Sequence, residues 1–223
     1  MEIERSGASA ILIENTDAEK HNIVWLERLS VQRSSNRVTE LPTGSVARAI
    51  ELRLKSAYVL IRNVDAENNM AGLVEVTFTS ETREKESEVT LAQNTFWRTR
   101  RRDVIGVVNR GIRDANVRMS RNDLRHNSGS LQHDCVRVEN ATLEMQNNLF
   151  HDNTGRYILF ASDDHHEELP KDISDNLFWL NAGLSPATKT TVSIRSENLT
   201  FTGNALQNPA NEYEFVAEPR LVS

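Results

Sequence analysis

The chain has 223 residues, and its 32 acidic and 26 basic residues give a formal net charge of −6. We expect no nucleic-acid partner, because phosphate groups require a basic face and this chain is acidic overall. Hydrophobic residues make up 38 % of the chain, and no apolar run reaches the length of a membrane-spanning helix, so we expect no membrane segment in it.

Residues 1–45 have the least regular pattern of the chain. Short apolar runs at 11–13 and 23–26 predict a first coil, and the turn residues of 33–44 predict a loop. We find no amphipathic helix that would cap an open sheet end here. The chain is therefore expected to be a segment of a longer protein.

From residue 50 onward, short segments alternate between apolar and polar residues. Such segments are found at 50–54, 59–61, 74–78, 89–91, 136–138, 143–145, 192–194 and 199–201. Alternation over three to five residues predicts short strands with one apolar side. No segment has the pattern of a helix of three turns.

A longer pattern repeats along the same region. Residues 119–129, 145–155 and 173–183 share the form apolar-x-x-Asn-x-(Leu/Phe)-x-x-Asn-small-Gly. With two looser copies, the first asparagine of the pattern recurs at Asn94, Asn122, Asn148, Asn176 and Asn204, with spacings of 28, 26, 28 and 28 residues. A fixed period of this size is typical of a stacked repeat.

The repeat predicts the fold class. A unit of about 28 residues with three short strands cannot bury its own apolar face, but stacked units bury it against one another. We therefore predict an all-β protein, a right-handed parallel β-helix of about seven coils. Residues 1–223 would form a single domain, with 1–45 as an irregular first coil or cap.

The recurring asparagines have a structural explanation. A sharp corner between strands needs a residue near the left-handed region, which asparagine tolerates well. Their stacked amides would hydrogen-bond from coil to coil in an asparagine ladder. The Leu or Phe two residues later is predicted to point inward, so that Phe96, Leu124, Phe150, Phe178 and Leu206 form one internal stack.

The five-fold asparagine series with its apolar neighbours resembles the right-handed parallel β-helix proteins of the pectate-lyase-like superfamily. The resemblance covers about residues 45–215. Within that superfamily, 153–160 and 198–215 look like segments of the bark beetle (Anakonda) type of animal cell-junction protein. The scavenger-receptor and lectin-like modules of that family are absent from this chain.

One loop is rich in side chains that can bind metal. Asp163, Asp164, His165 and His166 are adjacent, so a bound metal is one interpretation and a solvated loop is the other. Hydrolases of this fold place paired acids on neighbouring coils, whereas the acids here lie in one loop without partners above or below. We therefore predict no catalytic residues, no cofactor and no dedicated metal site.

Two further features bear on function. Asn140 and Asn198 begin glycosylation sequons, both placed by the repeat at a surface corner between the first two strands of their units. Cys135 is the only cysteine, and its place before Val136 predicts a buried structural thiol.

The residue after each inward Leu or Phe should point outward. These outward residues are Trp97, Arg125, His151, Trp179 and Gln207, which we call the Trp ridge. Two tryptophans in one exposed row can contact a sugar or a protein partner. Cover by neighbouring loops is the alternative interpretation.

The resemblance and the missing catalytic set imply a non-enzymatic extracellular segment for cell adhesion or cell-junction assembly, with a protein or glycan partner. It would belong to a larger secreted or membrane-anchored protein. The alternatives are a carbohydrate-binding or carbohydrate-cleaving protein of the same fold, and an intracellular scaffold.

Overall fold

A computed structural model describes most of the chain. The described residues are 2–4, 9–15, 21–33, 48–70, 72–79, 86–100, 102–111, 115–163, 169–184, 191–196 and 198–207. They form strands and connecting corners, and none of them is helical. The predicted loop at 33–44 lies almost entirely outside the described residues.

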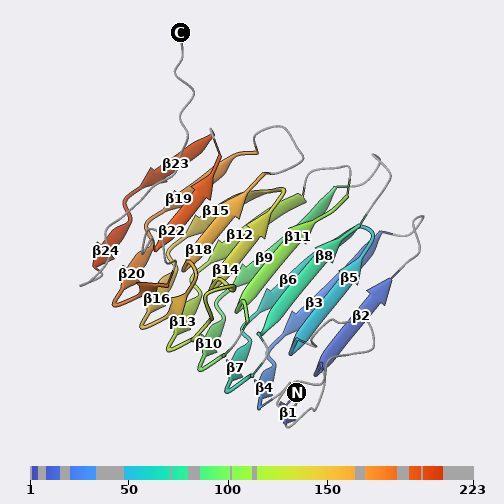
Figure 1. The fold of residues 1–223 in the computed structure, drawn as a ribbon. Helices are drawn as coiled ribbons and strands as arrows, with labels where there is room; N and C mark the ends of the chain where they lie inside the picture. The colour runs from blue at the N-terminus through green and yellow to red at the C-terminus, as the bar shows by residue number, and fades with distance from the viewer. Residues whose placement is uncertain are drawn as a thin grey trace.

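Three long parallel sheets run the length of the molecule (Figure 1). Sheet A contains β1 (Glu2–Glu4), β4 (Ser30–Gln32), β7 (Asp65–Glu67), β10 (Thr95–Trp97), β13 (Asp123–Arg125), β16 (Leu149–His151), β20 (Leu177–Trp179) and β24 (Ala205–Gln207). Sheet B contains β2 (Ile11–Asn15), β5 (Ile50–Leu54), β8 (Val74–Phe78), β11 (Ile105–Asn109), β14 (Val136–Glu139), β18 (Leu159–Ser162) and β22 (Val192–Arg195). Sheet C contains β3 (Asn22–Glu27), β6 (Ala57–Arg62), β9 (Ser87–Ala92), β12 (Ala115–Ser120), β15 (Ala141–Gln146), β19 (Lys171–Ser174) and β23 (Leu199–Thr202). A short pair, β17 (Thr154–Gly155) and β21 (Ala182–Gly183), extends two of the coils.

Each coil passes through sheet B, then sheet C, then sheet A, and every strand pairs in parallel with the strands of the coils beside it. The molecule is thus the predicted parallel β-solenoid. About five coils follow one another at a spacing of about 28 residues. This number is slightly lower than the seven coils of that length that were predicted. Strands β2 to β7 before them are unevenly spaced, but they pair in the same sheets, with β2, β3 and β4 beside β5, β6 and β7.

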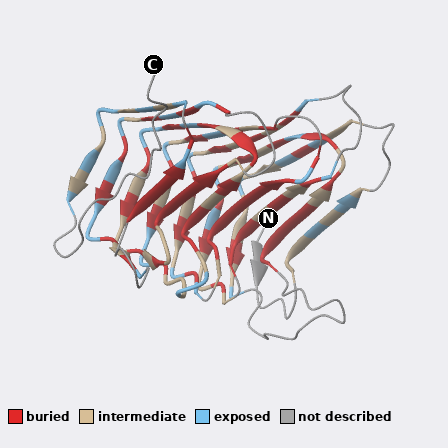
Figure 2. Ribbon diagram, turned by 45° about the horizontal axis from the view of Figure 1, so that its top comes forward, coloured by how far each residue is buried: buried red, intermediate tan, exposed pale blue. Residues whose placement is uncertain are grey.

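The core is the inside of this tube. Buried residues dominate the middle coils, while the first and last strands are more exposed (Figure 2). On sheet A the residues in register are Phe96, Leu124, Phe150, Phe178 and Leu206, as predicted. The rings of Phe150 and Phe178 stack with centroids 4.7 Å apart. This row forms one continuous apolar column along the solenoid.

An asparagine ladder holds the corner between sheets C and A. Each side-chain amide of Asn94, Asn122, Asn148 and Asn176 donates to Oδ1 of the next asparagine in the series at 2.9 Å, ending at Asn204. The same Oδ1 atoms also accept the backbone N–H of the preceding ladder residue. Each of these side-chain amides donates a second hydrogen bond to a backbone carbonyl of the coil before, as Asn148 does to Met119 at 2.9 Å. Each buried amide is thereby satisfied on both its donor and its acceptor side.

A second ladder follows the sheet A strands. Asn127 donates to Asn153 at 2.9 Å, and Asn153 donates to Asn181 at 3.0 Å. These are the second asparagines of the repeat pattern, and all three are buried. The two ladders, one at each end, therefore hold β13, β16 and β20 in register.

The explanation of the asparagines by left-handed backbone is wrong. The left-handed residue is the one before each ladder position: Gln93, Arg121, Asn147 and Asp175 before the first ladder, and His126, Asp152 and Leu180 before the second. The ladder asparagines themselves are not among the positive-φ residues. They are required because a short primary amide donates and accepts within one coil spacing.

Replacing Phe150 with alanine tests the internal column. We expect Phe150→Ala to lower the free energy of unfolding by about 3–5 kcal/mol, because it opens a cavity between rigid coils. Leu177→Ala, at a neighbouring position that is 39 % exposed, should cost well under half of that. Urea unfolding of both variants measures the difference, and equal losses would contradict the assigned register.

Replacing Asn148 with alanine tests the ladder. The variant leaves donors of Asn122 without their acceptor in a buried corner, which should cost about 1–3 kcal/mol. Gln146→Ala is the control, since Gln146 lies outward and exposed on the same coil. A loss of only a few tenths of a kcal/mol for Asn148→Ala would mean that the ladder does not stabilise the fold.

Candidate functional site

The Trp ridge lies along the outer face of sheet A. Parallel pairing aligns Trp97 with Arg125, Arg125 with His151, His151 with Trp179, and Trp179 with Gln207. The rigid coils beneath fix this alignment, because the preceding residue is buried in the apolar column on β10, β13, β16 and β20. Trp179 is 40 % exposed and Trp97 is half-buried, so the ridge is open to solvent without being fully exposed.

Neighbouring side chains cover the indole faces of the ridge. His151 stacks on Trp179 with ring centroids 4.5 Å apart and planes at 25°. The guanidinium carbons of Arg98 and Arg125 lie 4.6 and 5.9 Å from the centroid of Trp97. At least one face of each tryptophan is therefore already in contact with a ring or a cation from the same surface.

A cluster of two imidazoles and a carboxylate adjoins the ridge. His151 Nε2 lies 3.1 Å from Asp152 Oδ2, and His126 Nδ1 lies 3.6 Å from the same oxygen. His126 comes from the coil before, at the end of β13. The sequence pattern predicted only His151 at this surface, because the corner residues His126 and Asp152 have no place in a simple in-and-out alternation.

Asp163, the first residue of the acidic loop, pairs with a buried lysine. The side chain of Asp163 is only 4 % exposed and accepts two hydrogen bonds from Lys171 Nζ at 2.9 and 2.8 Å, while Leu169 N–H donates to it as well. Lys171 occupies an inward position of sheet C, so Asp163 neutralises a buried ammonium. Asp164, His165 and His166 lie outside the described residues.

The two sequon asparagines differ in exposure. Asn198 is exposed, in agreement with its predicted surface corner. The surface prediction is wrong for Asn140, which is 6 % exposed and donates its side-chain amide to the carbonyl of Asn109 at 3.2 Å. An oligosaccharide on Asn140 would require this amide nitrogen to leave the corner.

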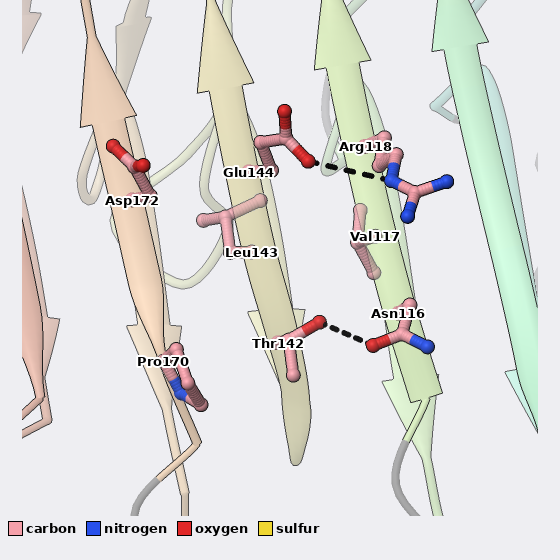
Figure 3. Close-up of a pocket in the computed structure, with 8 residues that line it drawn as sticks. All are labelled: Asn116, Val117, Arg118, Thr142, Leu143, Glu144, Pro170 and Asp172. Carbon is pink, nitrogen blue, oxygen red and sulfur yellow. Dashed lines mark hydrogen bonds and ion pairs between the residues drawn. The ribbon is translucent and has the colours of Figure 1, made fainter.

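A shallow polar depression lies on the outer face of sheet C (Figure 3). It is lined by Asn116, Val117, Arg118, Thr142, Leu143, Glu144, Pro170 and Asp172. Thr142 donates to Asn116 at 2.7 Å, and Arg118 pairs with Glu144 at 3.3 Å. Parallel pairing also aligns Glu144 with Asp172, so two carboxylates do lie on neighbouring coils here, which the sequence analysis did not predict.

A buried charge network lies where sheet A leads into sheet B. Asp103 accepts the backbone N–H of Asp134 at 2.7 Å and has Arg48, His133 and Arg137 within 3.6–3.9 Å. Burial alone would raise the pKa of Asp103, but His133 and Arg48 outweigh it, so its pKa lies below its ordinary value. This network was not predicted, since its members share no repeated spacing.

Asp134 is in the same network but behaves oppositely. Arg156 donates to it at 3.0 and 2.7 Å, and Tyr157 N–H donates at 3.1 Å. Complete burial nevertheless raises the pKa of Asp134. The adjacent Cys135 is buried and not disulfide-bonded, as predicted, and burial raises the pKa of its thiol, so the nucleophilic thiolate is disfavoured.

The chain matches no protein-family model, no curated protein and no solved structure. Among the described residues, no helix is both long and apolar enough to span a membrane.

The Asp103 network predicts a pH dependence of stability. Because its pKa is lowered in the folded protein, Asp103 stabilises the fold above its ordinary pKa of about 4, and this contribution is lost as the pH falls through the folded value. Asp103→Asn should therefore lower stability at neutral pH and flatten the loss of stability between about pH 5 and pH 3. Asp172→Asn, which removes an exposed carboxylate on sheet C, serves as the control in urea unfolding at each pH. If the free energy of unfolding of Asp103→Asn fell between about pH 5 and pH 3 as steeply as that of the wild type, the assigned direction of the pKa shift would be contradicted.

Proposed function

We propose that this chain is a non-catalytic segment of an adhesion or cell-junction protein, which binds a protein partner through the Trp ridge. The observation that carries the proposal is the register of sheet A, which aligns Trp97, Arg125, His151 and Trp179 in one row. Tryptophan and arginine are the residues that most often dominate the binding energy of protein interfaces.

The covered indole faces favour a protein partner over a sugar. Sugar rings bind tryptophan mainly by lying flat on an exposed aromatic face. Here His151 already stacks on Trp179, and Arg98 lies over Trp97. These contacts reduce the indole surface on which a sugar ring can lie, whereas the guanidinium groups beside the indoles can donate hydrogen bonds to the mixed polar and aromatic surface of a protein.

The extracellular setting is part of the proposal and rests on the resemblance to β-helix cell-junction proteins. The exposed Asn198 sequon is consistent with it. A parallel solenoid suits adhesion mechanically, because the backbone hydrogen bonds between its coils run along the axis. Its outer rows also form long, flat contact surfaces.

Carbohydrate cleavage is the second candidate, favoured by the aligned Glu144 and Asp172 on sheet C. Hydrolysis of a glycosidic bond needs two carboxyl groups, one of them protonated at working pH by an apolar surrounding. Neither carboxylate has an apolar surrounding, because the side chain of Glu144 is 60 % exposed and pairs with Arg118, and Asp172 is exposed. We therefore rank this function second.

Cell adhesion to the immobilised chain tests the proposal. The double variant Trp179→Ala with Arg125→Ala should raise the coating density needed for half-maximal adhesion by about tenfold or more, since each such truncation removes an interface anchor. Tyr58→Ala is the matched control, because Tyr58 is an aromatic residue 48 % exposed on sheet C.

Two results would count against the proposal. Equal adhesion of the ridge variant and the Tyr58→Ala control would exclude the ridge as the contact surface. Turnover on a polysaccharide panel that is lost in Glu144→Gln or Asp172→Asn would replace adhesion with the second candidate function.

A further inference from the structure

We propose that His126, His151 and Asp152 form a binding site for a divalent transition-metal ion of the Zn²⁺ type. One ligand atom from each residue lies within 4.8 Å of the other two. The site is independent of the proposed adhesion function, although it shares His151 with the Trp ridge.

The distances suit a single ion. Donor atoms held about 2.0–2.1 Å from a tetrahedral Zn²⁺ lie roughly 3.3 Å from one another. The separations of Asp152 Oδ2 from His151 Nε2 and His126 Nδ1 are 3.1 and 3.6 Å, on either side of that value. The two imidazoles offer ligand nitrogens within 4.8 Å of each other, and their rings meet edge to face with centroids 5.6 Å apart.

The backbone fixes the positions from which the ligand side chains project. His126 and Asp152 occupy equivalent left-handed corners of adjacent coils, with φ of 53° and 52°. Each directly precedes a buried ladder asparagine, Asn127 or Asn153, and these two are hydrogen-bonded to each other at 2.9 Å. The N–H of His126 also donates to the carbonyl of His151 at 3.0 Å. A metal site on such fixed elements loses little entropy when the ion binds.

The ligand types select the class of ion. Two imidazoles and one carboxylate suit Zn²⁺ and its transition-metal neighbours, whereas Ca²⁺ and Mg²⁺ require oxygen ligands. Three protein ligands leave at least one coordination position open to water or to another donor. The nearest cation on the ridge, Arg125, pairs with Asp123 at 3.4 Å and lies over Trp97 on the preceding coil.

Zinc titration of the metal-free chain by calorimetry tests the site. We expect one Zn²⁺ per chain with no response to Ca²⁺. His126→Ala and Asp152→Asn should each raise the Kd for Zn²⁺ by at least about tenfold, since even residues that only orient a ligand contribute that much. His21→Ala is the matched control, because His21 lies on a distant coil and should leave the Kd unchanged.

Two further experiments distinguish loss of this site from unfolding of the variant and from zinc binding at the acidic loop. Circular dichroism and melting without metal establish that each variant folds, and Zn²⁺ should then raise the Tm of the wild type and of His21→Ala but not of His126→Ala. A joint His165→Ala and His166→Ala variant tests the acidic loop. Loss of zinc binding there, or unchanged binding in both His126→Ala and Asp152→Asn, would overturn the proposal.

Discussion

The hydrogen bond between stacked asparagine amides is the constraint on which the rest of this structure depends. A primary amide buried at a solenoid corner loses its water, and leaving it unpaired would cost about 1–3 kcal/mol. Asn122 avoids this cost because Oδ1 of Asn148, one coil further on, accepts from its amide at 2.9 Å, and the carbonyl of Leu91 accepts the second amide hydrogen at 2.9 Å. Each coil therefore needs the next, and a slip of one residue would leave amides unpaired at the corner and turn the apolar column outward.

The same constraint determines the outer surface. The ladders lie on both sides of the sheet A strands, so the outward row of that sheet cannot shift relative to its neighbours. That is why Trp97 and Trp179, far apart in sequence, stand in one line with Arg125 and His151 between them. A loop-borne site would need its own supporting contacts, whereas here the core contacts support the surface row directly.

The sequence predicted the features that repeat and missed those that do not. The period of the asparagines predicted the solenoid, the inward column and the Trp ridge, because each depends only on position within one unit. The Asp103–Asp134 network joins corners of uneven length, and Lys171 replaces an apolar residue in a single coil. Such singular contacts leave no periodic signal. The preference of asparagine for left-handed backbone was also misleading, since the ladder and not the backbone requires that residue.

Left-handed backbone does not by itself mark a functional site in this protein. A positive φ in a residue other than glycine usually suggests local strain worth explaining by function. Here it recurs at thirteen described non-glycine positions, including Arg121 and Leu180, as the way in which each corner is made. What distinguishes His126 and Asp152 is therefore their chemistry. The architecture supplies fixed, outward corner positions in every coil, and one neighbouring pair of them carries side chains able to share an ion with His151.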